Sequence, residues 1–334
     1  MSDRFTHMVR WLAACHDCAA HDLLLDTVAD DASFRRYFRL TLPDGQTRIV
    51  MDAPPALEDS TSFVDIAARW ASAGIPVPAL FEYTLEEGFI VLEDLGDIML
   101  RQALDDEHRV DTLIDHALSL STRIAAQPTE GLPVYTAERL RDEMNLVLEW
   151  TLPWLELTPP ADWPQAIERI VDAITDQPYV TTHRDYTAQN VMVQGERLRV
   201  IDFQGAFRGP LSFDLTCLLR DRHAPWPAAK LDHWVAAFHG KAQGIGLITE
   251  RSPERVRADF EATSAQRSIK VLGGFCRTAF RDGKPRYLGH MPHFLDHACA
   301  ALAALDERAL LDWFEREFRP ALATALSHPE ALPS

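Results

Sequence analysis

Asp185, Asn190 and Asp202 are the residues of this chain whose types and spacing most directly suggest chemistry. The segment 191–201, between the last two, has the alternation of two short strands joined by a Gly-containing turn. Such a hairpin would bring the three polar groups to one edge of a small sheet. Phosphoryl transfer from ATP needs a carboxylate that accepts the proton of the attacking hydroxyl, together with oxygen ligands that hold Mg²⁺. The pattern therefore predicts that Asp185 acts on the acceptor and that Asn190 and Asp202 bind the metal.

The whole pattern is more specific than its parts, because a lone His-Arg-Asp tripeptide is equally compatible with a charged turn. With the fixed offset to Asn190, the hairpin and Asp202-Phe203, the chain resembles the protein-kinase-like superfamily in its catalytic loop and metal-binding segment. The resemblance implies that Asp214 accepts backbone N–H bonds from the catalytic loop. We expect His183 to hold that loop by packing and hydrogen bonding rather than to transfer protons.

Length, composition and charge restrict the class of protein. A chain of 334 residues with 47% hydrophobic and 25% charged residues has room for two folded subdomains. The net charge of −17 argues against nucleic acid or an anionic membrane as the main partner. No apolar run approaches the roughly eighteen residues that span a bilayer, and the N-terminus is polar rather than signal-like. We expect a cytoplasmic monomer.

The five cysteines do not form the framework of a disulfide-rich protein. Cys15, Cys18 and His21 could be read as a metal site. However, apolar residues recur at helical spacing through this region, at Phe5, Met8, Trp11, Leu12 and Cys15. We therefore favour a buried helix face over a zinc site.

Residues 1–95 predict a small nucleotide-binding lobe that begins with this helix. Its pattern is strand, strand, strand, helix, strand, strand, and the clearest segments are 38–42, 48–51, 61–72, 81–84 and 89–92. Residues 96–334 predict a larger lobe with helices at about 107–127, 135–151, 163–175, 226–239, 253–272, 292–305 and 307–326. The expected fold is therefore α+β and bilobal, with a small antiparallel sheet lobe and a larger helical lobe that holds the catalytic loop and the acceptor site.

Within that superfamily, the motifs His183-Arg184-Asp185, Asn190 and Ile201-Asp202-Phe203 resemble the aminoglycoside phosphotransferase and choline kinase branch. Only eleven residues separate Asp202 from Asp214, too few for a regulatory loop and a peptide-binding platform. The acceptor should therefore be a small molecule. Further segments are similar to the anomeric kinases of bacterial cell-wall recycling, which phosphorylate N-acetylmuramic acid and N-acetylglucosamine: 31–39, Val50-Met-Asp-Ala-Pro-Pro55 with Glu58-Asp59, Asp202-Phe-Gln, Arg208-Gly-Pro and Leu218-Leu-Arg-Asp221.

The nucleotide side departs from the kinase pattern in two ways. No glycine precedes Gly45, so the turn over the phosphates must be built from residues 31–34, with Ser33 and Phe34 as candidate contacts. The third strand has no lysine, so we expect the guanidinium of Arg35 or Arg36 to bind the phosphates. The connection from Glu93 to Leu95 should bind adenine through its backbone.

The acceptor side is marked by a local excess of positive charge. Segment 270–286 has five basic residues and one acid, which favours an anionic acceptor over a cationic aminoglycoside, although a solvated helix face is the plain alternative. The candidate substrate contacts are Arg277 in this segment and Gln204, Arg208 and Asp221 beyond the metal site, of which we expect Asp221 to be the least well placed.

Two rival functions stay open on these grounds. One is a kinase of the same branch that acts on an aminoglycoside, choline, homoserine or another sugar. The other is a pseudokinase, suggested by the missing lysine alone. The intact set of Asp185, Asn190 and Asp202 argues against the pseudokinase, because a chain without turnover has no physical need for all three.

Overall fold

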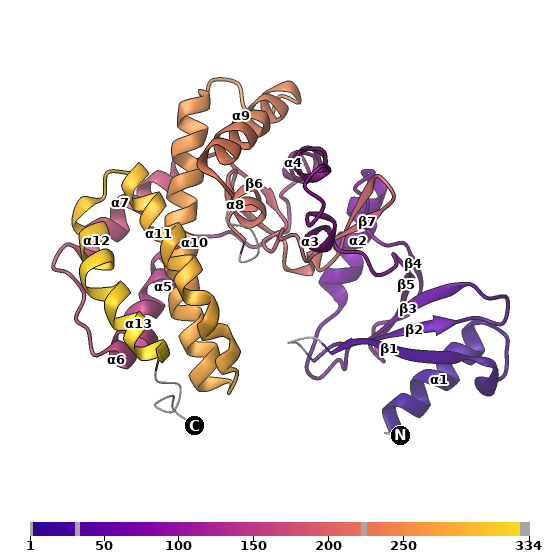
Figure 1. Cartoon of the computed structure of the whole chain (residues 1–334). Helices are drawn as coiled ribbons and strands as arrows, with labels where there is room; N and C mark the ends of the chain where they lie inside the picture. The colour runs from indigo at the N-terminus through magenta and orange to yellow at the C-terminus, as the bar shows by residue number, and fades with distance from the viewer. Residues whose placement is uncertain (1–2, 31–33, 222–225, 328–334) are drawn as a thin grey trace. The chain divides into compact units, whose positions relative to one another are not determined.

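The computed structural model describes residues 3–30, 34–221 and 226–327 (Figure 1). The chain divides into two compact units, one of Met1–Val110 with Ala188–Gly205 and one of Asp111–Thr187 with Ala206–Ser334. The predicted nucleotide-binding lobe, 1–95, lies within the first unit. The functions assigned to the two predicted lobes stay predictions.

The first unit is built on a five-stranded antiparallel sheet. Four of its strands were expected from alternating apolar residues, and the helix α2 (Thr61–Ser72) has the predicted bounds. The strand order is β1-β2-β3-β5-β4, with bounds β1 (Leu24–Asp30), β2 (Arg36–Thr41), β3 (Thr47–Asp52), β5 (Phe89–Glu93) and β4 (Leu80–Thr84). The predicted antiparallel sheet lobe is confirmed.

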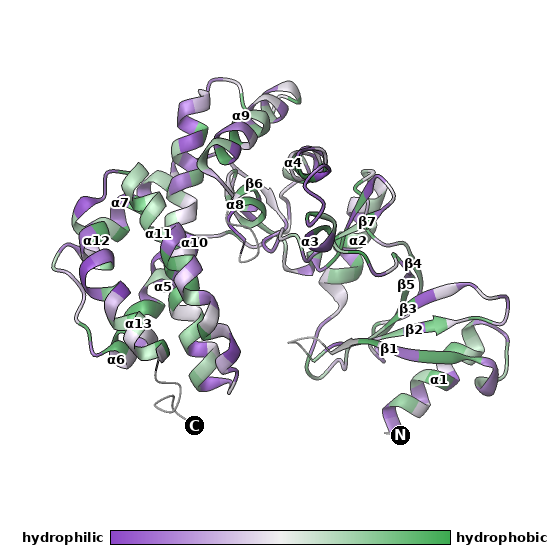
Figure 2. Cartoon of the chain, in the orientation of Figure 1, coloured by the Kyte–Doolittle hydropathy of each residue, from purple (hydrophilic) through white to green (hydrophobic). Residues whose placement is uncertain are grey.

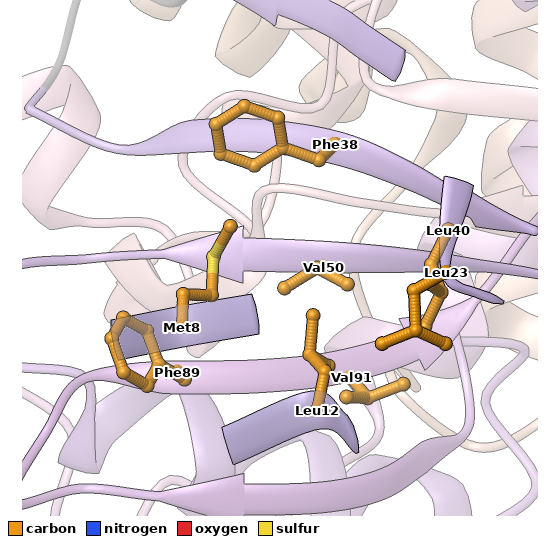
Figure 3. Packing of buried hydrophobic residues seen from close by; sticks show 8 residues of the cluster. All are labelled: Met8, Leu12, Leu23, Phe38, Leu40, Val50, Phe89 and Val91. Atoms are coloured by element: carbon orange, nitrogen blue, oxygen red, sulfur yellow. The ribbon is translucent and has the colours of Figure 1, made fainter. Parts of the chain in front are cut away.

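The N-terminal helix α1 (Asp3–Cys15) packs against this sheet (Figure 1). Its residues Met8 and Leu12 are fully buried in a cluster with apolar residues of β2, β3 and β5, of which Phe38, Val50 and Phe89 are seen in Figure 3. The helix predicted from the apolar repeat is confirmed. Burial of these side chains supplies the free energy that holds α1 on the sheet.

The hairpin of β7 (Val191–Gln194) and β8 (Arg197–Val200) follows the prediction closely. Its turn needs a left-handed residue, and Gly195 supplies one at φ +62°. Backbone bonds tie the hairpin into the first unit: Val193 N–H donates to Ile98 O at 2.8 Å and Val200 N–H donates to Pro76 O at 2.9 Å.

The second unit is mainly helical. Its short strands β6 (Tyr179–Thr182) and β9 (Phe207–Pro210) pair antiparallel beside the catalytic loop. The helices are α4 (Val110–Ala125, which begins on the last residue of the first unit), α5 (Ala137–Leu146), α6 (Leu152–Leu155), α7 (Trp163–Thr175), α8 (Phe213–Leu219), α9 (Ala228–Gly244), α10 (Pro253–Arg281), α11 (Met291–Ala304), α12 (Arg308–Trp313) and α13 (Arg319–Ser327).

Helix α10 is nine residues longer than the pattern predicted, because tertiary packing outweighs the weak helix propensity of Gly273-Gly274. A Cβ on Gly273 would lie 2.4 Å from the carbonyl carbon of Leu146. The glycine therefore lets α10 approach the end of α5, where the chain makes a π-helical turn at Val147–Thr151. Polar and apolar residues are interleaved along α10 (Figure 2). Across the described ranges, no helix is both long and apolar enough to cross a bilayer.

Candidate functional site

Asn190 and Asp202 lie at the open end of the β7–β8 hairpin, in the first unit. Val191 pairs with Val200, and the carbonyl oxygen of Asn190 accepts the N–H of Ile201 at 3.0 Å. The two predicted metal ligands are thereby brought to neighbouring positions of paired strands. Asp202 has a positive φ of +61°, a backbone conformation that costs a non-glycine residue conformational free energy. Residues in such conformations are often found at functional sites.

The Asp202 carboxylate is partly exposed, at 38%, and lies among polar side chains. Gln204 donates from Nε2 to Asp202 Oδ1 at 2.5 Å. Arg35, only 7% exposed, has Nη1 at 3.7 Å from the same oxygen and Nη2 at 3.3 Å from Glu58 Oε2. A guanidinium therefore lies between two carboxylates beside the candidate metal ligand.

The structure separates the two arginines that the sequence left as alternatives. Arg36 pairs with Asp52, whose other oxygen lies 2.7 Å from Arg4 Nη2. Arg36 is thus engaged with the end of β3, whereas Arg35 is directed to Asp202. Of the turn residues, Phe34 is 62% exposed and Ser33 lies outside the described residues.

Phe203 anchors the segment of the predicted metal ligand Asp202 in the apolar core. Its ring stacks on Phe63 of α2 at 4.9 Å and contacts Trp70 of the same helix at 5.7 Å. The packing holds the backbone next to Asp202. We did not single out Phe63 and Trp70 from the sequence, although their helical spacing on the apolar face of α2 was a usable signal.

The predicted adenine-binding connection is held to the sheet by polar contacts. Glu93 N–H donates to Ala79 O at 2.9 Å, and the Glu93 carboxylate pairs with Arg199 at 2.5 Å. Burial raises the pKa of Glu93, but the Arg199 guanidinium, the Ala79 N–H and the charge of Arg48 together outweigh it, so the net direction is down. Leu95 is buried. The side chain of Glu93 therefore serves the architecture of the first unit.

The predicted catalytic loop, which contains Asp185, belongs to the second unit and is clamped by a buried carboxylate. Asp214 Oδ2 accepts the N–H of His183 at 2.7 Å, and Oδ1 accepts the N–H of Arg184 at 3.1 Å. His183 is fully buried and accepts the N–H of Asp185 on Nδ1 at 3.3 Å. The expected loop-holding contacts of Asp214 and His183 are confirmed. Arg184, at φ +79°, makes the sharp change of direction before Asp185.

The electrostatics of the clamp are unusual. Burial raises the pKa of Asp214 to about 7, although its two backbone N–H bonds lower it, and the nearby Asp185 carboxylate adds to the rise. A clamp that must accept two N–H groups works best as the ionised carboxylate, because protonation turns one oxygen into a donor.

Replacement of Asp214 by Asn is expected to lower kcat by about 10- to 100-fold. The amide keeps one acceptor oxygen and turns an NH₂ group toward a backbone N–H, which removes a charge-assisted bond worth roughly 1.5–3 kcal/mol. Steady-state kinetics measure the loss, and KM for ATP should change little. An unchanged kcat would show that the clamp does not position the loop.

Asp214 is expected to affect folding stability and kcat in opposite ways as the pH changes. Because its folded pKa of about 7 exceeds the ordinary 3.8, its contribution to stability is full below pH 4 and is lost as pH rises to about 7. Activity should change in the opposite direction and fall as pH drops below about 7. The Asp214→Asn variant should lose both dependences, as thermal unfolding and kcat measured across pH 5.5–9 would show.

The predicted acceptor contacts are placed unequally. Arg208 is exposed on β9, and its carbonyl accepts the N–H of Tyr135 at 2.9 Å. Asp221 is 4% exposed, and its carbonyl bonds Nε2 of His293 at 2.8 Å. Arg277 is half-buried on α10, and its Nε has no hydrogen-bond partner within the described part of the chain. Gln204 lies with Asp202 in the first unit.

Arg267, on the same face of α10, was missed in the sequence analysis. It lies close enough to Asp185 and Asp221 for both carboxylates to raise its pKa. Asp221, which we expected to be the least well placed of the substrate contacts, thus shares a charged neighbour with Asp185. The available signal was spacing: Arg267, Lys270, Gly274 and Arg277 follow one another at three or four residues, the period of one helix face.

Comparison with known proteins agrees with this geometry. Residues 25–257 match the model of the phosphotransferase enzyme family. The chain is 35% identical over 293 residues to the N-acetylmuramate/N-acetylglucosamine kinase of Pseudomonas putida, with 86% of each chain covered. It is 37% identical to the protein of the same name from Pseudomonas aeruginosa, with 85% of each covered.

A solved structure of a choline/ethanolamine kinase family protein from Mesorhizobium loti shares the fold, with a TM-score of 0.64 at 15% identity, and the match covers 93% of this chain and 99% of the other. The kinase-like fold expected from the motifs is thus confirmed. A clamped catalytic loop, a hairpin ending in Asp202 and a family match over most of the chain lead to one conclusion: this protein belongs to the phosphotransferase enzyme family and is an ATP-dependent kinase.

Proposed function

We propose that this protein transfers the γ-phosphoryl group of ATP to the anomeric hydroxyl of N-acetylmuramic acid and N-acetylglucosamine, a reaction of peptidoglycan recycling. The observation that carries the proposal is the loop of Asp185, whose neighbouring amides are clamped by Asp214, in a chain similar over most of its length to kinases named for these sugars. The predicted cytoplasmic, monomeric state belongs to the same proposal.

Asp185 is the proposed acceptor of the sugar hydroxyl proton. The transition state of phosphoryl transfer is loose, so the gain comes mainly from holding the hydroxyl in line with the phosphorus. The His183 ring and the Asp214 carboxylate limit how far the loop backbone can move. A rigid loop lowers the entropic cost of reaching the reactive geometry.

Asn190 and Asp202 are the proposed ligands of Mg²⁺. The pair fits the ion, because an amide oxygen and a partly exposed carboxylate at adjacent strand ends are hard oxygen donors. The bound ion would neutralise charge on the ATP phosphates. Gln204, which bonds Asp202, orients that carboxylate in this proposal.

Arg35 is the proposed substitute for the missing lysine. Its buried side chain is fixed by Glu58 and lies 3.7 Å from the Asp202 carboxylate, beside the proposed metal site. A planar guanidinium at this place matches the geometry of a phosphate. Ser33, Phe34 and the backbone of Glu93 to Leu95 complete the proposed nucleotide contacts.

Replacement of Arg35 by Met is expected to raise KM for ATP by about 10- to 100-fold, since one charge-assisted contact is worth roughly 1.5–3 kcal/mol. Arg36→Met is the matched control, because it removes a neighbouring guanidinium that pairs with Asp52. In this control, KM for ATP should stay within about threefold of the parent value. Equal effects of both changes on KM would contradict the assignment of Arg35.

A panel of acceptors tests the proposed function. Purified protein with Mg-ATP is incubated with N-acetylmuramic acid, N-acetylglucosamine, an aminoglycoside, choline and homoserine, and ADP release is measured. Phosphorus NMR of the product distinguishes a phosphate on the anomeric carbon from one on another hydroxyl. Turnover of another acceptor alone would favour a different kinase of the branch. No turnover with any acceptor would favour the pseudokinase.

A further inference from the structure

Arg267 differs from the other arginines near the start of α10 in its lack of an ion pair. Arg251 pairs with Asp259, Arg255 lies 3.5 Å from the same residue, and Arg257 lies 2.8 Å from Glu261. In contrast, no carboxylate of the described residues lies within 4.0 Å of the Arg267 guanidinium. A half-buried guanidinium without an ion pair keeps N–H donors that an external anion can bind, which makes Arg267 a candidate for that role.

The Arg267 side chain is held in place by two contacts. Nη1 donates to the carbonyl oxygen of Arg220 at 3.2 Å, and the guanidinium lies over the ring of Phe294 at 5.7 Å. A guanidinium has five N–H donors, so an anchored and stacked group keeps further donors for a ligand. Fixing the group in advance reduces the entropy that binding must lose.

Arg267 lies near Asp185, the residue proposed to act on the sugar hydroxyl that accepts the phosphoryl group. Burial opposes its charged form, but the Cys217 thiol and the Asp221 and Asp185 carboxylates outweigh it and raise the pKa of Arg267. The contacts agree with this placement: Arg267 binds the carbonyl oxygen of Arg220, the residue before Asp221, and Cys217 Sγ lies 3.6 Å from the carbonyl oxygen of Arg184, the residue before Asp185. These residues all belong to the second unit, so the arrangement is internal to one compact body.

The adjacent positive charge on α10 is already neutralised. Lys270 Nζ lies 2.7 Å from Glu143 Oε2, and Glu143 Oε1 also accepts Arg139 Nε at 3.0 Å. Farther along the helix, Arg281 pairs with Asp282 at 2.7 Å. Arg277, two turns or more beyond Lys270, also has no ion pair among the described residues, so its nearness to Asp185 is what distinguishes Arg267.

We propose that Arg267 binds the carboxylate of an acidic acceptor sugar and so determines how well the enzyme uses N-acetylmuramic acid relative to N-acetylglucosamine. This inference rests on the proposed function. The two sugars differ by the lactyl ether on C3, which carries a carboxylate two ring carbons from the anomeric centre. A guanidinium matches a carboxylate through two parallel N–H bonds, and a neutral sugar has no group to pair with it.

The test compares kcat/KM for the two sugars in Arg267→Gln, Arg267→Lys and the parent. Arg267→Gln is expected to lose about 10- to 100-fold on N-acetylmuramic acid, the equivalent of one charge-assisted contact, and less than about threefold on N-acetylglucosamine. Arg267→Lys should recover part of the loss, because it restores the charge but not the planar fork. Arg281→Gln, on the same helix and paired with Asp282, is the matched control and should leave the ratio unchanged.

An equal loss on both sugars would overturn the inference, because it would show that Arg267 acts through Asp185 or through folding. If Arg267→Gln has a lowered Tm, the sugar ratio of Arg267→Lys decides the question in the same way. Failure of the proposed function gives a different result: the parent enzyme then phosphorylates neither sugar.

Discussion

Asp185→Asn is expected to abolish phosphoryl transfer while ATP binding stays close to that of the parent. The amide cannot accept the hydroxyl proton and binds the acceptor hydroxyl in a different orientation. Positioned proton transfer contributes about 10²- to 10⁴-fold, and misplacement of the hydroxyl adds to the loss. We expect kcat to fall by at least about 10³-fold. Single-turnover kinetics measure the chemical step, and titration with a fluorescent ATP analogue measures binding.

The control for this change is Asp142→Asn, which alters an exposed carboxylate on α5 of the same unit. It should leave both measurements unchanged within about twofold. Near-parental turnover in Asp185→Asn would show that Asp185 does not act on the acceptor. A parallel loss of ATP affinity would show that it acts on the nucleotide instead.

Asp202→Ala should have the second large effect, and on a different step. Removing the carboxylate takes one hard ligand from the proposed metal site and removes a negative charge that lies 3.7 Å from Arg35 Nη1. We expect the affinity for ATP in the presence of Mg²⁺ to fall by about 100-fold, with turnover lost as a consequence. Calorimetric titration of ATP with and without Mg²⁺ measures the change.

The effect of Asp202→Ala should depend on the metal. Without Mg²⁺ the parent and the variant should bind ATP with similar affinity, whereas Asp185→Asn should retain the full gain from Mg²⁺. Glu86→Ala, an exposed acid between β4 and β5, is the matched control. If Mg²⁺ strengthens ATP binding equally in Asp202→Ala and the parent, Asp202 is not a metal ligand.

Local patterns were enough to place the elements that carry the site. The bounds of α2 and α7 follow from their apolar repeats, and the β7–β8 hairpin follows from alternation around Gly195. Helix α10 shows the limit of this reasoning. Its extension past Gly273 depends on contact with Leu146, a residue far away in the chain, and no local propensity contains that information.

The interaction partners of individual side chains were harder to predict from the sequence than the helices and strands. Arg35 and Arg36 are adjacent and chemically identical, so sequence alone left them as alternatives. Their neighbours decide between them: Arg35 lies between Glu58 and Asp202, and Arg36 pairs with Asp52. Likewise, Arg267 stands out only because the acids that pair with other arginines of its helix do not reach it.

The residue order by itself indicated the reaction class, because the proposed catalytic carboxylate and the two proposed metal ligands stand at short fixed offsets within one motif. The tertiary structure decided which charged groups form ion pairs with one another. Ion pairing depends on distances of a few ångströms between residues far apart in the chain, and those distances exist only after the chain has folded.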